Sequence, residues 1–379
     1  MGANRHVLAA GVLLVLLAAL GLGQGALERA AAARSQDAGQ VPRFEVDPGW
    51  PAIPDTLNMG EVTSVAVDRQ DHVWILHRPE SGPAVLEFDA AGRYLQGWGG
   101  PGAGYEWPAI AHGIFVDYKD NVWVGGRSGE APADDMLLKF TAHGTLLLQI
   151  GRRGASAGNA DTGNLHQPAD QFVHGATNEL LVADGYGNRR VIVFDADTGA
   201  FKRMWGGFGN PPDAASAVEE DEPLDATGRG PDQFTNPPLQ VTAVHCVTVA
   251  NDGLVYVCDR DNRRIQVFAL DGTYRTQLFI NRAAPSRRSA SRVAFSPDAE
   301  QRFLYVADFN SRVVVVERRT LGILDAFGSE GDGPGQFRGI HHLAADSSGN
   351  LYVAESNPGS RVQKFVYRGL GAPSGSVAD

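Results

Sequence analysis

The chain has 379 residues, of which 43% are hydrophobic and 20% charged, a composition typical of a globular protein with a sizeable core. Its formal net charge of -11 argues against nucleic acid and against an anionic membrane surface as partners, because both require a basic face. The 46 glycines and 21 prolines suit a fold with many tight turns.

The N-terminal segment has the pattern of a secretory signal peptide. A basic start precedes an apolar run over residues 7–22, and small residues follow it. We predict a signal peptide at 1–25 and a disordered linker at 26–42. The alternative is an uncleaved anchor, although the run is short for a full membrane span. In both cases we expect the rest of the chain to be secreted or periplasmic, without membrane contact beyond the signal segment.

A recurring unit fills most of the remaining chain. Each copy has an apolar strand that ends near Asp, a turn, a second strand rich in Val, Trp and Tyr, a third strand of the form R-V-x-x-F, and a fourth strand that ends in an aromatic residue and Gly. Units of about 40 residues with four strands and no helical periodicity are typical of β-propeller blades. The copies occupy residues 62–99, 111–151, 169–206, 244–279, 291–328 and 340–369. The sequence therefore predicts an all-β fold, a six-bladed β-propeller over residues 43–369, with 370–379 as a disordered tail.

The sixth copy lacks one strand. The segment "RFEVDP", centred on Phe44–Val46, is expected to complete it, because pairing the two ends of the chain removes an open sheet edge. A solenoid is the structural alternative, but it requires capping repeats, and none is visible. The connection 207–238 is acidic and rich in Pro and Gly; we expect a surface loop that either covers one face or has no role.

Two cysteines flank a predicted hairpin. Cys246 and Cys258 lie at equal distances from Asp252, the centre of the stretch "VTVANDGLVYV". They would face each other across the two strands. In an oxidising compartment this arrangement predicts a disulfide, and the alternative is a pair of buried thiols.

Three histidines occur in the same register at the head of an inner strand. They are His112 in "AHGIFVD", His245 in "VHCVTVA" and His341 in "IHHLAAD"; His341 rather than His342 keeps the register of the Asp that closes the run. They belong to the second, fourth and sixth copies. Alternate blades of a six-bladed propeller are about 120° apart, so three side chains at equal depth meet on the channel axis.

Three neutral imidazoles with an open fourth position are typical of a catalytic zinc site. Such an ion lowers the pKa of a bound hydroxyl group or water molecule. The alternative is that the histidines fill the channel and bind water. The other blades place Thr63, Ala169 and Ser291 at this level, so the fold itself does not require histidine there.

The second strands of the blades end in further polar residues that are expected near the same face. These are Arg78 in "WILHR", Arg127 in "WVGGR", Tyr186 in "VADGY" and Arg260 in "YVCDR". An arginine can bind a carboxylate through two hydrogen bonds, and a tyrosine beside a metal can act as a general base. Singly, each residue is more typical of a turn or surface. A second recurring set precedes the third strands: Asp184, Asp259 and Asp308. We interpret these aspartates mainly as structural turn residues that tie strand ends, as we do the arginines in "NRRV", "NRRI" and "NSRV".

These motifs resemble a known family. "GQFRGIHHLAADSSGNLYVAESNPGSRVQKF" looks like an NHL repeat, and "HGIFVD", "VADGYGNRRVIVFD" and "VHCVTV…CDRDNRRIQVF", in this order, resemble the peptidyl-α-hydroxyglycine α-amidating lyases over roughly residues 43–368. The resemblance implies a secreted six-bladed propeller with a three-histidine zinc site. Its reaction breaks the C–N bond of a peptidyl-α-hydroxyglycine to give a peptide amide and glyoxylate.

Carried onto this chain, the resemblance implies zinc on His112, His245 and His341 and a catalytic base at Tyr186. It also implies that Arg78 and Arg260 hold the carboxylate of a small-molecule or peptide substrate. We expect a monomer.

Two departures from the family pattern affect these expectations. Gly187 stands where relatives carry a cysteine, so one family disulfide is absent. His342 stands where they carry an aspartate near a structural Ca²⁺, which puts calcium binding in doubt. The alternatives are a propeller hydrolase or lactonase and a non-catalytic NHL-repeat binding module, because fold alone does not decide function.

Overall fold

The computed structural model describes residues 39–102, 104–212, 243–282, 284, 289–356 and 359–375. The predicted signal peptide and nearly all of the predicted linker lie outside these residues, as does the acidic connection beyond residue 212. Within the described residues, no helix is long and apolar enough to cross a membrane.

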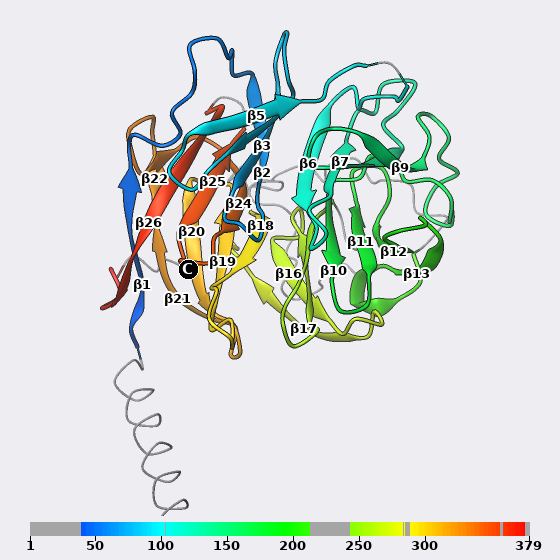
Figure 1. Cartoon of the computed structure of the whole chain (residues 1–379). Helices are drawn as coiled ribbons and strands as arrows, with labels where there is room; N and C mark the ends of the chain where they lie inside the picture. The colour runs from blue at the N-terminus through cyan, green and yellow to red at the C-terminus, as the bar shows by residue number, and fades with distance from the viewer. Residues whose placement is uncertain are drawn as a thin grey trace, which may run out of the picture.

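The described strands form six four-stranded antiparallel sheets, which are the blades of a propeller (Figure 1). Blade 1 contains β2 (Glu61–Val67), β3 (Val73–Arg78), β4 (Val85–Phe88) and β5 (Tyr94–Trp98). Blade 2 contains β6 (Ala111–Val116), β7 (Val122–Gly126), β8 (Met136–Phe140) and β9 (Leu146–Gly151). Blade 3 contains β10 (Asp170–His174), β11 (Glu179–Asp184), β12 (Arg190–Asp195) and β13 (Phe201–Trp205), followed by the short 3-10 helix η1 (Gly207–Gly209).

The second half of the chain repeats this plan. Blade 4 contains β14 (Val244–Val249), β15 (Val255–Asp259), β16 (Arg264–Phe268) and β17 (Tyr274–Phe279). Blade 5 contains β18 (Ala290–Phe295), β19 (Phe303–Asp308), β20 (Arg312–Glu317) and β21 (Gly322–Phe327). A short parallel pair, β22 (Ser329–Glu330) and β23 (Gln336–Phe337), leads to blade 6, which contains β24 (Ile340–Ala345), β25 (Leu351–Glu355), β26 (Arg361–Gly371) and β1 (Val41–Asp47).

The two ends of the chain close the ring in blade 6. The N-terminal strand β1 pairs with β26, so the sheet order is β1-β26-β25-β24, and Figure 1 shows the blue and red strands side by side. This confirms the closure predicted from Phe44–Val46. The pairing reaches from Val41↔Gly371 to Asp47↔Lys364, so the propeller spans 41–371 where the sequence predicts 43–369. Each end extends further because β1 and β26 satisfy each other's backbone groups there.

Each inner strand contacts the inner strands of both neighbouring blades, in the closed order β2, β6, β10, β14, β18, β24. The apolar side chains of adjacent blades pack against each other between the sheets; Leu76, Ile114 and Val124 form one such cluster between blades 1 and 2. Burial of these faces removes apolar surface from water and fixes the blades around one central channel.

Aspartates at strand ends hold the turns in repeated positions. The carboxylate of Asp117 accepts a hydrogen bond from the indole nitrogen of Trp123 at 2.9 Å, and Asp68 accepts the equivalent bond from Trp74 at 2.9 Å. The structural role predicted for the aspartates before the third strands is confirmed, because each pairs with an arginine of that strand: Asp184 with Arg190 at 2.8 Å, Asp259 with Arg264 at 2.5 Å and Asp308 with Arg312 at 2.9 Å. These side chains are committed to the fold.

The cysteine pair forms the predicted link between β14 and β15. Cys246 and Cys258 are directly opposite in the register of these strands and are joined by a disulfide. Both residues are fully buried.

Candidate metal centre and its rim

The three histidines of the shared register lie together inside the channel. His112 on β6, His245 on β14 and His341 on β24 are 2%, 2% and 6% exposed. Their ring centroids are 5.2 Å apart for the first pair, 4.7 Å for His112 and His341, and 4.9 Å for His245 and His341. One ring nitrogen from each lies within 4.8 Å of the others, which is close enough for a single ion to bind all three.

Each imidazole is oriented by a backbone carbonyl of the next blade. The Nδ1 atom lies 2.7 Å from the Ala169 oxygen in His112, 2.7 Å from the Ser291 oxygen in His245 and 2.6 Å from the Thr63 oxygen in His341. A carbonyl only accepts, so each Nδ1 carries the proton. Each Nε2 therefore keeps its lone pair, the tautomer that a metal ligand needs. We call Thr63, His112, Ala169, His245, Ser291 and His341 the histidine layer.

A β-bulge in the inner strands places this layer. In β14 the register passes from Val244↔Asp259 to Cys246↔Cys258, so His245 is the extra residue without a partner on β15. Thr63, Ser291 and His341 hold the same extra position, and the register of β6 shifts around His112. A bulge re-aims a side chain and increases the local twist, so it directs these residues at the channel. Sequence reasoning missed these bulges, since the apolar pattern of the strands carries no signal for them.

Burial makes the three imidazoles neutral. It lowers the pKa of His341 to about 3, and it lowers the pKa of His112 and of His245 well below the ordinary value. Repulsion from neighbouring groups contributes after burial: a proton on His112 would be repelled by any proton on the other histidines, and a proton on His245 by the charge of Arg260. The donor set thus fits a zinc ion, which binds neutral imidazole nitrogen.

Tyr186 closes one side of the cluster. Its hydroxyl oxygen lies 3.0 Å from Nε2 of His112 and 3.1 Å from Nε2 of His245. Its turn follows β11 and packs directly on β14: a Cβ atom on Gly185 would lie 2.2 Å from the Val244 oxygen. Only glycine permits this approach, which brings the tyrosine beside the strand that carries His245.

The turn at the neighbouring Gly187 is held without a disulfide. A Cβ atom at this position would lie 2.3 Å from the His166 ring, so the imidazole occupies the space that a larger side chain would need. The backbone of Gly187 also donates to the His166 oxygen at 3.0 Å. Packing and a main-chain hydrogen bond hold this turn.

Three arginines from different blades surround Tyr186. Arg260 is buried and donates to the tyrosine hydroxyl at 3.3 Å, while its Nε pairs with Asp261 at 3.3 Å. Arg78 pairs with Glu61 at 2.6 Å and donates to the Ala111 oxygen at 2.9 Å. The guanidinium carbon of Arg127 lies 5.4 Å from the centre of the Tyr186 ring. The residues predicted from the ends of the second strands thus assemble around the histidines.

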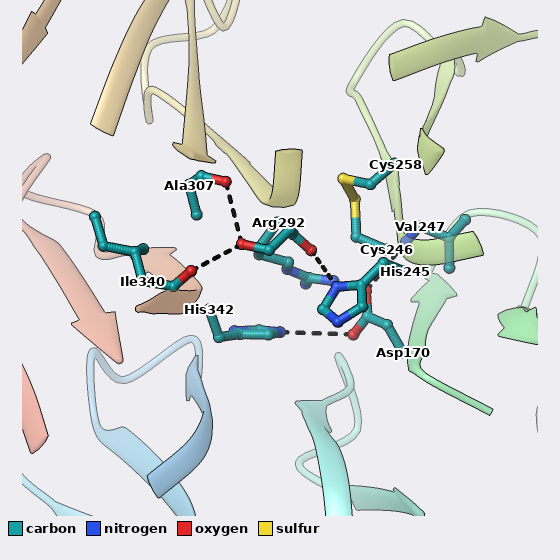
Figure 2. The surroundings of a disulfide bond; sticks show 10 residues. Asp170, His245, Cys246, Val247, Cys258, Arg292, Ala307, Ile340 and His342 are labelled. Atoms are coloured by element: carbon teal, nitrogen blue, oxygen red, sulfur yellow. Dashed lines mark hydrogen bonds and ion pairs between the residues drawn. A yellow bond between two sulfur atoms is a disulfide. The ribbon is translucent and has the colours of Figure 1, made fainter. Parts of the chain in front are cut away.

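The next residues along the inner strands form a different layer. Asp170, Arg292 and His342 are 1%, 6% and 4% exposed; we call them the ion-pair layer. Arg292 pairs with the Asp170 carboxylate, which also accepts from the Val247 backbone nitrogen at 3.1 Å. Figure 2 shows the His342 ring directed at Asp170, near His245 and the disulfide. Nε2 of His342 lies 3.6 Å from Oδ1 of Asp170.

This layer does not fit the calcium ion that the resemblance raised. Ca²⁺ takes six to eight oxygen ligands, often from carboxylates. Here the one carboxylate is already paired with a guanidinium, and the residue after His341 is an imidazole. The donor set of this layer therefore does not favour Ca²⁺.

A second group of possible metal ligands lies on blade 1 and has a structural explanation. Asp68, His72 and Glu87 offer ligand atoms that lie within 4.8 Å of one another. However, Asp68 accepts from two backbone nitrogens and from Trp74, and the His72 ring lies 2.7 Å from Glu87. These groups satisfy each other within a turn.

The fold and the site define a class of protein: a six-bladed β-propeller with a buried cluster of three histidines in its channel. Comparison with known proteins agrees with this class. The family description "NHL repeat" matches residues 244–268. Among solved structures, a streptogramin B lyase structure superposes with a TM-score of 0.51 over 86% of this chain and 98% of that chain at 11% identity, which supports the fold alone.

Three known proteins resemble this chain over much of its length. The chain is 28% identical over 332 residues to human NHL repeat-containing protein 3, covering 85% of this chain and 84% of that protein. It is 26% identical over 357 residues to peptidyl-alpha-hydroxyglycine alpha-amidating lyase 1 of Drosophila melanogaster, covering 86% of this chain and 60% of that protein. It is 27% identical over 244 residues to peptidyl-glycine alpha-amidating monooxygenase B of Xenopus laevis, covering 59% of this chain and 24% of that protein. These matches confirm the predicted resemblance to the amidating lyase family.

Proposed function

We propose that this chain is a secreted, zinc-dependent carbon–nitrogen lyase that cleaves a peptidyl-α-hydroxyglycine-like carbinolamide to an amide and glyoxylate. The observation that carries the proposal is the convergence of His112, His245 and His341 with every Nδ1 bound to a carbonyl. A merely space-filling histidine has no need of a shared tautomer, whereas a ligand set does. The similarity to a named amidating lyase over 86% of this chain points to the same reaction.

His112, His245 and His341 would hold the ion. When bound, zinc supplies a Lewis acid that makes a nearby hydroxyl group more acidic and stabilises negative charge on its oxygen. The remaining chemistry is assigned to groups of the chain.

Tyr186 is placed to accept the proton of the substrate hydroxyl. Its oxygen lies against the ligand atoms of His112 and His245, so a hydroxyl group bound there would be within its reach. Arg260 donates to the same oxygen and holds the hydroxyl group beside the histidines. As the O–H electrons form the new carbonyl of glyoxylate, the C–N electrons pass to the amide nitrogen, which takes a proton. No water is consumed.

The rim supplies positive charge for a carboxylate. Arg78, Arg127 and Arg260 all lie around Tyr186, and glyoxylate and its carbinolamide precursors carry a carboxylate next to the reacting carbon. The disulfide and the signal-like N-terminus support secretion, and we propose a monomer that acts on a small molecule or peptide.

The test is glyoxylate release from α-hydroxyhippurate by the zinc-loaded protein. We expect stoichiometric zinc and benzamide and glyoxylate in equal amounts. Tyr186→Phe should retain zinc and lose activity by about a hundredfold or more, the range of a lost general base. Tyr118→Phe is the matched control, since that exposed tyrosine bonds Asn178 on the outer surface. Full activity in Tyr186→Phe would contradict the assignment of Tyr186 as the base. Zinc-loaded protein that releases no glyoxylate would contradict the proposed lyase reaction.

A further inference from the structure

Arg127 differs from the other two arginines of the rim in what surrounds its charge. It directly follows β7, and its backbone nitrogen donates to the Ile110 oxygen at 2.9 Å, beside the strand that carries His112. This anchors the main chain. The side chain is half-buried and lies over the ring of Tyr186.

The guanidinium groups of the other two arginines are occupied. Arg78 is bound to Glu61 and to the Ala111 oxygen. Arg260 is bound to Asp261 and to the Tyr186 hydroxyl. Among the residues that the structure describes, Arg127 has neither an ion pair nor a side-chain hydrogen bond. Three guanidinium groups thus face two paired carboxylates, which leaves one positive charge uncompensated by these pairs.

The buried acid Asp134 of the loop that follows Arg127 is not available to it. Asp134 accepts from the backbone nitrogens of Ala109, Ile110 and Ser128, each at 2.9 Å, and Arg153 lies 3.5 Å from it. The carboxylate holds the loop closed. It therefore cannot turn to Arg127 without breaking these bonds.

The charge of Arg127 lies at the rim of the histidine cluster, because its guanidinium carbon is 5.4 Å from the centre of the Tyr186 ring. A half-buried cation without a carboxylate partner among the described residues is the arrangement expected of a receptor for an anion.

We propose that Arg127 is the residue that binds the substrate carboxylate, and that Arg78 and Arg260 are positioning residues. Arg78 orients the rim through Glu61, and Arg260 orients Tyr186. This assignment replaces the one implied by the resemblance, in which Arg78 and Arg260 hold the carboxylate. It rests on the proposed function for the reaction, but it needs only that the ligand be a small carboxylate. Because guanidinium binds carboxylate through two parallel hydrogen bonds, the ligand class is a small monocarboxylate, and the proposed function narrows it to an N-acyl-glycine type acid.

The test measures binding without turnover. Hippurate has the carboxylate of the lyase substrate but no hydroxyl group, and hippuramide is its neutral analogue. Isothermal titration of the zinc-loaded protein should give a dissociation constant for hippurate that rises about ten- to hundredfold in Arg127→Gln, the range for a lost charge-assisted pair. Hippuramide binding should not change, and Arg127→Lys should retain part of the affinity.

Two comparison variants make the assignment specific. Arg78→Gln should weaken hippurate binding less than Arg127→Gln does, and Arg275→Gln, an exposed arginine on β17, should not affect it. With α-hydroxyhippurate, Arg127→Gln should raise KM more than it lowers kcat. An equal or larger loss in Arg78→Gln, or unchanged hippurate binding in Arg127→Gln, would overturn the proposal.

The outcomes separate this inference from the proposed function. If the wild-type protein binds hippurate through Arg127 but releases no glyoxylate, the reaction is wrong and the carboxylate receptor stands. If glyoxylate is released while Arg127→Gln leaves both hippurate affinity and KM unchanged, the reaction stands and the receptor is wrong. A wild-type protein that does not bind hippurate at millimolar concentration also refutes the receptor.

Discussion

The histidine layer and the ion-pair layer are consecutive positions of the same inner strands, yet they handle charge in opposite ways. In the histidine layer, neutral rings from alternate blades turn three lone pairs toward one another. In the ion-pair layer, Arg292 and Asp170 neutralise each other. The histidine layer thus offers three lone pairs to a cation, whereas the ion-pair layer already contains the guanidinium cation of Arg292.

The difference arises from which blades contribute. Even-numbered blades supply all three histidines and odd-numbered blades supply the carbonyls that orient them, so the layer has approximate threefold symmetry. The ion-pair layer takes its groups from blades 3, 5 and 6, so its contacts run across the channel without threefold symmetry. The repeat therefore sets the depth of a side chain in the channel. The residue types that alternate blades place at that depth decide whether the layer can bind a metal.

The largest expected effect is loss of the metal from the histidine layer. His245→Ala removes one of three ligands and should weaken zinc binding by more than about a hundredfold, beyond the effect of losing an outer-sphere partner. Competition with a zinc chelator measures it. His143→Ala is the control, because that exposed histidine contacts Gln96 on the outer surface. Equal zinc affinity in both variants would show that the ion lies elsewhere.

The next effect tests the cation of the ion-pair layer. Arg292→Met leaves the Asp170 carboxylate buried without its partner, and we expect the free energy of unfolding to fall by about 3–5 kcal/mol. The double variant Arg292→Met/Asp170→Asn should recover most of this loss, because the amide keeps an acceptor for the Val247 nitrogen without a charge. Urea unfolding measures both. A double variant less stable than the single one would contradict an internal charge pair.

A smaller effect concerns pH in the metal-free protein. Burial lowers the pKa of His112, His245, His341 and His342 below the ordinary value, so the folded chain resists protonation that the unfolded chain accepts below pH of about 6.5. Stability is therefore fully present above that pH and is lost as the pH falls toward about 3, the pKa of His341. Each histidine should contribute about 1.4 kcal/mol per pH unit.

His342→Gln isolates one of these contributions. Its free energy of unfolding, measured by urea between pH 6.5 and 5, should fall less steeply than that of the wild-type protein by the share of one histidine. Wild-type and variant curves that run parallel would show that His342 titrates normally in the folded chain.

The smallest expected effect is the response to calcium, which should be absent. Since the ion-pair layer carries its own cation, adding Ca²⁺ or a calcium chelator should leave the melting temperature unchanged, whereas zinc should raise it through the histidine layer. Differential scanning calorimetry checks both ions. A rise of several degrees with Ca²⁺ would mean that another set of ligands binds it.

Much of the fold could be predicted because it is repeated and local. The strand pattern with its Asp turns identifies the blades, and pairs such as Asp184 with Arg190 lie only a few residues apart. Cys246 and Cys258 could be paired because they flank a single hairpin. The strands β1 and β26 extend beyond the predicted ends because long-range pairing, which no local pattern encodes, continues to Val41 and Gly371.

Within the candidate site, the sequence by itself determined which residue types share a depth: a six-fold repeat with histidine at one register position of alternate copies must bring His112, His245 and His341 to the axis. Only the tertiary structure decided the state of each group. The acceptors of the three Nδ1 atoms, the pairing of Asp170 with Arg292 and the contrast between Arg78 and Arg127 depend on partners in other blades or on the path of a loop. Hydrogen bonds and ion pairs act over a few ångströms in space, so distance along the chain does not reveal them.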